Sequence, residues 1–306
     1  MQHTPTVRSL LWWKIWLMAS RPATFSASVV PVLVGTAAAI AGGCFRPGVL
    51  TAALLSSLFI QMGTNYTNDL YDFQRGVDGA HRVEPLRVSR TGVINPRSLA
   101  KCAGLMFSLA ILIGLYLVHL GGWPILLIGL AGIASGIFYT AGPWPLGYHG
   151  LGDPFVFIFF GPVGVMGTFY LHTGSVHPLI FVVSLPVAFL VTAILVINNL
   201  RDINTDPLAG KMTIAVKIGH AATRWEYAGL LAAPYLVLLL LWRVSEYGFH
   251  ILWPFLTLPL CISLQRKVLY KAEGSALNSI LIKTSVLHIL FGIFFAYALL
   301  VSRASA

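Results

Sequence analysis

PLIFVVSLPVAFLVTAILVINNLRDINTD, the stretch from Pro178 to Asp206, changes its chemistry sharply near its end. Residues 178–199 are almost all apolar and are long enough to cross the hydrocarbon core of a bilayer as a single helix. Arg201, Asp202 and Asp206 follow directly. The stretch therefore predicts a membrane-spanning helix that delivers two acids to one membrane surface.

The composition of the whole chain agrees with a membrane protein. Hydrophobic residues make up 57% of the chain and charged residues only 10%, whereas about a quarter of the residues of a soluble domain are charged. The three cysteines have no paired spacing, so we expect buried thiols and neither a disulfide nor a metal site. No cleavable signal peptide is expected, because the first apolar run is followed by no small-residue cleavage site.

Apolar runs of spanning length recur along the chain. We expect nine transmembrane helices in one all-α membrane domain that covers residues 1–306. The runs are 22–42, 49–67, 99–120, 123–140, 154–171, 178–199, 226–243, 249–265 and 284–302.

The basic residues predict how this bundle is oriented. With the N-terminus in the cytoplasm, nine spans place seventeen of the 20 lysines and arginines on the cytoplasmic side and three outside. The C-terminus then lies outside. Topology and attraction to anionic lipid account for the net charge of +10, so we expect membrane lipid and no nucleic acid as a partner.

Two cytoplasmic connections, about 68–98 and 200–224, are long and polar, and they contain five aspartates. The first begins within NYTNDLYDFQRGVD (65–78), where Asn65, Asp69 and Asp72 follow helical i, i+4, i+7 spacing. Asn198, Asp202 and Asp206 repeat the pattern after the sixth run. This weak internal repeat predicts a binding site between the two halves of the chain.

Clustered carboxylates require a positive partner. Two unit charges 4 Å apart repel by about 4 kcal/mol at an effective dielectric near 20. A solvated helix end would explain one aspartate, but it does not explain two matching clusters. Hard oxygen ligands without His or Cys favour Mg²⁺ bridged to substrate phosphates. We therefore expect a lipid diphosphate, whose phosphate oxygens are bound by the nearest basic residues: Arg82, Arg87, Arg201 and Lys211.

Loss of diphosphate from an allylic lipid produces a carbocation. Such a cation needs a dry site with electron-rich faces nearby. The candidates are Tyr66, Tyr71, Tyr139 and Phe159.

At this point the sequence resembles the UbiA superfamily of intramembrane aromatic prenyltransferases. Its NDxxD-type motif matches NDLYD (68–72) and its DxxxD-type motif matches DINTD (202–206), each after the corresponding helix. The resemblance covers nearly the whole chain. It implies a nine-helix bundle with a central cavity open to the cytoplasmic side.

Within the superfamily the chain is most similar to the branch that prenylates 1,4-dihydroxy-2-naphthoate in menaquinone synthesis. The segments that carry this similarity are RPATFSASVVPVLVG (21–35), NDLYDFQRGVD (68–78), PLRVSRTGVI (85–94), YTAGPWPLGYHGLGDPFVFIFFGPV (139–163) and NNLRDINTDPLAGKMTIAV (198–216). Three positions depart from the branch pattern, at Glu84, Asp153 and residues 212–214. Glu84 adds a charge next to the expected diphosphate loop and leaves the aromatic acceptor open.

The resemblance implies a mechanism and a set of roles. Mg²⁺, as the cofactor, is held on a polyprenyl diphosphate by Asp69, Asp72, Asp202 and Asp206, the catalytic group. The allylic cation is then attacked by the aromatic ring, and the naphthoate loses its carboxylate. The residues implied in substrate binding are Asn65, Asn68, Asp78, Arg82, Arg87, Asn198, Arg201 and Lys211, with Arg21, Tyr139 and Asp153 near the aromatic acceptor.

Alternatives remain at this stage. A prenyltransferase for another acceptor, such as 4-hydroxybenzoate, homogentisate or a chlorophyllide, would carry the same motifs. A transporter with an acidic site would place acids near mid-span, where this chain has almost none. A phosphatidyl-type alcohol transferase would hold its acids in one continuous motif. For the favoured branch we expect a multi-pass protein of the bacterial inner membrane.

Overall fold

The computed structural model describes residues 12–75, 94–245, 247–270 and 272–304, and within these ranges it contains helices and no strand. The α-helices are α1 (Trp12–Ala19), α2 (Phe25–Ala41), α3 (Pro47–Gln74), α4 (Pro96–Gly121), α5 (Trp123–Phe138), α6 (Gly152–Ile158), α7 (Gly164–Thr173), α8 (Pro178–Asp202), α9 (Ile214–Val244), α10 (Leu258–Leu269) and α11 (Ala276–Ala304). Short turns join them: 3₁₀ helices η2 (Pro22–Thr24), η4 (Leu146–Tyr148), η6 (Pro207–Ala209) and η7 (Phe249–Thr257), and a π-helical turn η5 (Phe159–Val163).

The prediction of an all-helical membrane protein is confirmed. In the described part of the chain, seven helical segments are long and apolar enough to span a bilayer. They are Pro22–Ala41, Pro47–Gln74, Pro96–Gly121, Gly152–Thr173, Pro178–Asp202, Ile214–Val244 and Ala276–Ser302. Two of the nine predicted runs do not meet this criterion. The fourth forms α5, an apolar helix of 16 residues, and the eighth is divided.

Proline explains the division of the eighth run. Residues 249–257 form the 3₁₀ helix η7, which contains Pro254, and α10 begins at Leu258 with Pro259 in its first turn. Proline lacks a backbone N–H and so cannot continue the α-helical hydrogen-bond ladder through its own position. The expected single span is therefore two short helices in sequence.

The helix boundaries place the first acidic motif differently from the expected loop. Helix α3 continues to Gln74, so residues 68–74 are helical rather than part of the connection. Helix α8 ends at Asp202, and α9 already begins at Ile214, where the Thr213 side chain accepts a hydrogen bond from the backbone N–H of Val216 (3.3 Å). The second polar connection is thus shorter than 200–224.

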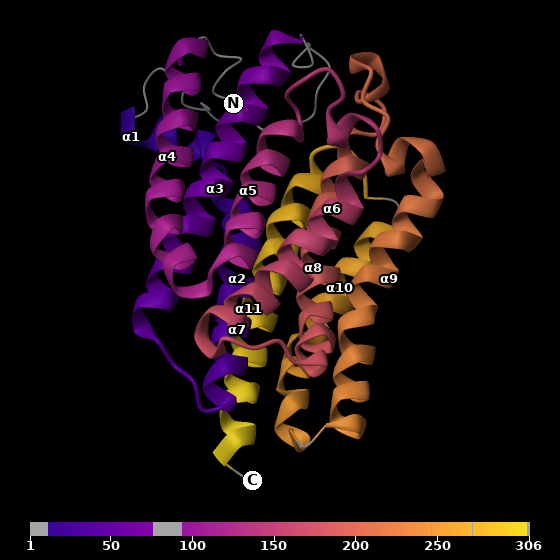
Figure 1. Ribbon diagram of the computed structural model, residues 1–306. Coiled ribbons are helices and arrows are strands. Elements are labelled where there is room, and N and C mark those ends of the chain that lie inside the picture. The colour runs from indigo at the N-terminus through magenta and orange to yellow at the C-terminus, as the bar shows by residue number, and fades with distance from the viewer. Residues whose placement is uncertain (1–11, 76–93, 246, 271, 305–306) are drawn as a thin grey trace.

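The helices pack side by side as a bundle (Figure 1). Helix α2 lies against α7 and α11, α3 against α4, and α8 against α9. A Cβ added at Gly35 of α2 would lie 2.5 Å from the carbonyl oxygen of Val165, so only glycine permits α2 and α7 to approach this closely. One buried core joins α2, α8, α9 and α11, and two smaller ones lie around α3 and α4.

Candidate functional site

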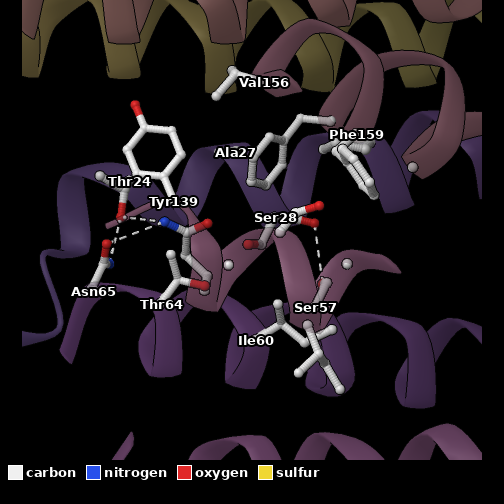
Figure 2. A pocket seen from close by; sticks show the side chains of 18 of the residues that line it. Thr24, Ala27, Ser28, Ser57, Ile60, Thr64, Asn65, Tyr139, Val156 and Phe159 are labelled. Carbon is white, nitrogen blue, oxygen red and sulfur yellow. Dashed lines mark hydrogen bonds between the residues drawn. The ribbon is translucent and has the colours of Figure 1, made fainter. Parts of the chain in front are cut away.

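A cavity of about 820 Å³ lies within the bundle. Its walls come from the α1–η2 segment, α2, α3, α4, α5, the α6–η5–α7 segment, α8 and the start of α11. Most of the lining is apolar, as Ala27, Ile60, Val156 and Phe159 illustrate in Figure 2. Polar side chains gather where α3 and α8 end and α11 begins. We call this set the polar rim: Arg21, Asn65, Asn68, Asp69, Asp72, Asn198, Arg201, Lys211 and Asn278.

The first acidic motif occupies the last two turns of α3 and faces the cavity. Asp69 is buried and forms an ion pair with Arg21. Arg21 adopts a left-handed backbone conformation (φ 54°), the one positive φ at a non-glycine residue in the described ranges. A strained backbone of this kind costs about 1–3 kcal/mol and persists only where its surroundings enforce it. The ion pair and the hydrogen bond that Thr24 Oγ1 donates to the Arg21 carbonyl (2.9 Å) supply that enforcement.

The segment between α5 and α6 donates hydrogen bonds to the other two polar residues of this motif, Asn68 and Asp72. Asn68 Oδ1 accepts a hydrogen bond from Thr140 Oγ1 (2.6 Å), and Asp72 Oδ1 accepts one from the Tyr148 hydroxyl (3.2 Å). Burial, and then the charge of Asp72, raises the pKa of Tyr148 to about 12, so its hydroxyl keeps its proton and donates. The guanidinium of Arg75 lies over the Tyr148 ring, 4.7 Å from its centroid.

The second motif is organised around Arg201. Its guanidinium donates to both carboxylate oxygens of Asp202, with Nε–Oδ1 at 2.9 Å and Nη2–Oδ2 at 2.7 Å. It also donates to Asn198 Oδ1 (2.9 Å) and Asn278 Oδ1 (3.1 Å). The Arg201 side chain is 5% exposed and that of Asp202 is 0% exposed. This bidentate, buried arrangement fixes the plane of the guanidinium at the cavity wall.

Asp206 lies in the turn that follows α8. The backbone N–H of Asp206 donates to the Asp202 carbonyl (2.8 Å), and that of Lys211 donates to the Asp206 carbonyl (2.9 Å). The Lys211 ammonium lies 3.3 Å from Asp206 Oδ2. The turn therefore folds Lys211 back over the second aspartate of the motif.

Both motifs meet at one cavity, but they contribute different side chains to it. Asp69 and Asp72 line the wall, whereas from the second motif it is Asn198, Arg201 and Lys211 that do. The Tyr139 side chain, also on the wall, lies within electrostatic range of Asp72 and Asp206. Among the residues that the structure describes, no three His, Cys, Asp or Glu side chains stand close enough to share a metal ion.

Several predicted residues lie elsewhere or cannot be placed. Asp78, Arg82 and Arg87 fall outside the described residues. Asp153 is buried behind the wall and accepts a long hydrogen bond from Asn199 Nδ2 (3.4 Å).

Of the four aromatic candidates, two face the cavity. Tyr139 and Phe159 line it. Tyr66 and Tyr71 are not part of the lining, and Tyr66 packs edge-to-face on Trp16, with the ring centroids 5.7 Å apart.

Sequence reasoning missed several partners of the motifs. Tyr148, Thr140 and Asn278 hold motif residues from distant segments, and no local spacing announces them. Gln61 also lines the cavity. It is an amide side chain within an otherwise largely apolar run, a position that is costly in a membrane helix and therefore could have been noticed.

The fold and the site together define a class. A bundle of membrane-spanning helices surrounds an apolar cavity and meets it at one end with carboxylates, amides and cations, as an enzyme acting on a lipid with a charged head group requires. The chain belongs to the UbiA prenyltransferase family, whose model matches residues 28–287. The predicted family is confirmed, and with it the class of enzyme, an aromatic prenyltransferase; the transporter alternative is set aside.

Known proteins resemble the chain over most of its length. It is 34% identical to the 1,4-dihydroxy-2-naphthoate octaprenyltransferase of Escherichia coli K12, with 95% of this chain and 96% of that protein covered. It is 39% identical to the enzyme of the same name from Mycobacterium tuberculosis, over 71% of this chain and 74% of the other.

A solved structure shares the fold. The UbiA homologue of Archaeoglobus fulgidus bound to GPP and Mg²⁺ superposes with a TM-score of 0.63 at 19% identity, covering 94% of this chain and 99% of that one. At this level of identity the likeness concerns the fold.

Proposed function

We propose that this enzyme transfers a polyprenyl chain from its diphosphate to 1,4-dihydroxy-2-naphthoate, with loss of the carboxylate as CO₂, in menaquinone biosynthesis. The observation that carries the proposal is the convergence of both acidic motifs on one end of an apolar cavity. The naphthoate relatives, at 32–39% identity, support the choice of acceptor.

The residues present fit a magnesium ion. The carboxylates of Asp69 and Asp72 and the amide of Asn68 are hard oxygen donors on the cavity wall, and Asp202 and Asp206 lie close behind it. Such a donor set suits Mg²⁺, which keeps several waters and binds substrate phosphates. Bound there, Mg²⁺ would neutralise charge on the departing diphosphate.

The cationic side chains of the polar rim would bind the phosphate oxygens of the substrate and orient the metal ligands. Arg201 and Lys211 line the cavity next to the second motif, and Arg21 lies next to the first. We assign Arg201 and Lys211 to the phosphate oxygens, where donors aimed at developing charge lower the barrier to C–O cleavage. We assign Arg21 to the orientation of Asp69.

The apolar wall holds the prenyl tail and excludes water from the allylic cation. Tyr139 and Phe159 face the cavity and offer their ring faces to that cation. After the C–O bond has broken and diphosphate has left, a ring carbon of the aromatic acceptor attacks the allylic cation to form the new C–C bond, and that carbon then loses its carboxylate as CO₂. Asp153 remains a candidate residue on the acceptor side. For Asp78, Arg82 and Arg87 the roles implied by the resemblance stay proposals.

The membrane arrangement is part of the same proposal. We infer that α5 and the η7–α10 pair also cross the bilayer and complete nine spans in a single domain, residues 1–306. The distribution of basic residues supports a cytoplasmic N-terminus and an external C-terminus in the bacterial inner membrane, with the polar rim open to the cytoplasm. Thiol labelling of single cysteines placed in each connection would check this order.

An acceptor assay tests the function. Membranes containing the enzyme receive one polyprenyl diphosphate, Mg²⁺ and, separately, dihydroxynaphthoate, 4-hydroxybenzoate or homogentisate. We expect a prenylated, decarboxylated product from the naphthoate alone, identified by mass spectrometry. EDTA should stop turnover and added Mg²⁺ restore it. Turnover of 4-hydroxybenzoate without the naphthoate would reject the acceptor, and activity that resists EDTA would reject the metal.

A further inference from the structure

Gln61 occupies a distinctive position on the cavity wall. It lies on α3 eight residues before Asp69, about 12 Å along the helix axis at 1.5 Å per residue. Thr24 and Asn65 line the cavity beside it, while most of the surrounding surface is apolar. Figure 2 shows Thr24 and Asn65 joined by a hydrogen bond on the side of the pocket near Tyr139. Gln61, Thr24 and Asn65 thus connect the polar rim, to which Asn65 belongs, with the apolar part of the cavity.

The orientation of the Asn65 amide is determined by its neighbours. Asn65 Nδ2 donates to the Ser20 carbonyl (2.7 Å) and to Thr24 Oγ1 (3.0 Å). A carbonyl can only accept, so the amide nitrogen, and not the oxygen, must face Ser20. The Thr24 hydroxyl donates its proton to the Arg21 carbonyl (2.9 Å). Its oxygen therefore acts as the acceptor for the side-chain amides of Asn65 and Gln61.

The same logic determines the orientation of Gln61. Its Nε2 donates to Thr24 Oγ1 (3.1 Å) and lies 3.5 Å from Asn65 Oδ1, and both of those atoms require a donor. Because its nitrogen faces these two atoms, the amide oxygen of Gln61 is left to accept a further hydrogen bond. In the part of the chain that the structure describes, no side chain donates to it.

Flat aromatic side chains line the same cavity. Phe155 and Phe159 are stacked, with centroids 5.8 Å apart, and Tyr139 joins them on the wall. An apolar aromatic surface in the same cavity as an available hydrogen-bond acceptor matches a planar aromatic ring that carries a hydroxyl group.

We propose that Gln61 is a specificity-determining residue: its amide oxygen accepts a hydrogen bond from a ring hydroxyl of the aromatic acceptor, in a subsite formed with Thr24 and Asn65. This inference rests on the proposed function and deepens it. By accepting the hydroxyl proton in a hydrogen bond, Gln61 orients the ring below the diphosphate and favours electron density on the carbon that attacks the allylic cation. A site built to pair a hydroxyl strongly disfavours an analogue that lacks it.

The test pairs a variant with a modified substrate. Wild type, Gln61→Leu and Gln61→Met are purified as full-length protein in detergent and assayed with dihydroxynaphthoate and its two monomethyl ethers. Gln265→Leu is the matched control, because this half-buried glutamine donates to the Ala228 carbonyl (2.8 Å) and lies outside the cavity lining. Separate KM values are measured for the acceptor and for the prenyl diphosphate.

We expect Gln61→Leu to raise the acceptor KM about tenfold, which corresponds to one hydrogen bond, with the diphosphate KM within about twofold of wild type. In wild type, kcat/KM for one of the two methyl ethers should be about tenfold lower than kcat/KM for dihydroxynaphthoate. In Gln61→Leu the two values should be almost equal, because the hydrogen bond between residue 61 and the ring hydroxyl is already lost. Gln61→Met is closer to glutamine in length and also lacks the acceptor oxygen, so it too should lose the methyl-ether penalty, and Gln265→Leu should behave as wild type.

An equal methyl-ether penalty in wild type and both Gln61 variants would overturn the inference, as would equal changes in both KM values in Gln61→Leu. If Gln61→Leu does not fold, Gln61→Met, which also lacks the amide oxygen, decides by the same comparison. Should wild type turn over 4-hydroxybenzoate instead of the naphthoate, the proposed acceptor fails, and the 4-methoxy analogue then tests Gln61 in its place.

Discussion

The two acidic motifs have nearly the same spacing in the sequence, yet they face the cavity in different ways. At the end of α3 the carboxylates of Asp69 and Asp72 are on the wall, and their partners come from segments far away in the chain, Arg21 and Tyr148. At the end of α8 the carboxylates of Asp202 and Asp206 are not part of the lining, and they pair with Arg201 and Lys211, which line the wall.

This difference has a local origin. In the second motif a cation stands directly before the first aspartate and another five residues after the second, so the ion pairs form within one helix end and one turn. The first motif has no cation at the corresponding place, and Asp69 is paired across 48 residues instead. We infer that the first motif mainly presents metal ligands and the second mainly presents phosphate donors.

The largest effect should come from the first motif. Asp72→Asn removes a carboxylate from the cavity wall and should lower turnover about 1000-fold or more. The reason is that Mg²⁺ would lose a ligand, and the charge of the departing diphosphate would be less well neutralised. The Tyr148 hydroxyl can still donate to the amide oxygen, so the melting temperature should fall less than for the matching change in the second motif. Activity assays and thermal melts of the detergent-solubilised protein measure both. Full activity in the variant would remove Asp72 from the site.

The matching change in the second motif should damage stability as well as turnover. Asp202→Asn removes the Asp202 carboxylate from its buried ion pair with Arg201, and breaking such a pair costs about 3–5 kcal/mol. We expect lost turnover together with a clearly lowered melting temperature. The double variant Arg201→Met, Asp202→Asn should recover stability but not activity. Equal melting temperatures for Asp72→Asn and Asp202→Asn would contradict the contrast between the motifs.

A subtler change separates charge from geometry. Arg201→Lys keeps a cation at the wall but loses the planar fork that contacts Asp202, Asn198 and Asn278 together. We expect kcat/KM for the prenyl diphosphate to fall about 10- to 100-fold, measured at saturating acceptor. A lysine variant with wild-type kinetics would mean that charge alone suffices there.

The smallest effect is expected at the support of the first motif. Tyr148→Phe deletes the hydroxyl that donates to Asp72 but keeps the ring beneath Arg75. A single hydrogen bond to a charged group contributes about 1.5–3 kcal/mol at most, and water can replace part of it here. We expect turnover to fall about two- to tenfold, with an increased Mg²⁺ requirement in a metal titration. An unchanged metal requirement would show that Tyr148 does not orient Asp72.

Much of the fold followed from local pattern. Long apolar runs predicted the spanning helices, since no other element satisfies its own backbone in lipid. Helical spacing also predicted that Asn65, Asp69 and Asp72 share a face, which α3 confirms by continuing to Gln74. The eighth run was less predictable, because whether Pro254 and Pro259 kink a helix or divide it depends on what packs around them.

The candidate site was predicted less completely. Asn68, Asp69, Asp72, Asn198, Arg201 and Lys211 do line one cavity, as the matching motifs suggested. The prediction that Asp69, Asp72, Asp202 and Asp206 together hold Mg²⁺ did not distinguish the two aspartates that line the cavity from Asp202 and Asp206, which do not. Gln61 was passed over, because its meaning depends on which hydrogen-bond donors reach Thr24 and Asn65.

By itself the sequence determined that this chain is a helical membrane protein, and that its acids follow two helices at corresponding places, because hydrophobicity and helical period act over neighbouring residues. The tertiary structure alone decided which of these acids reach the cavity, that Arg21 pairs with Asp69, and that the Gln61 oxygen remains available. Those outcomes depend on contacts between helices distant in the chain, whose approach is set by packing, as between Gly35 and Val165, rather than by local pattern.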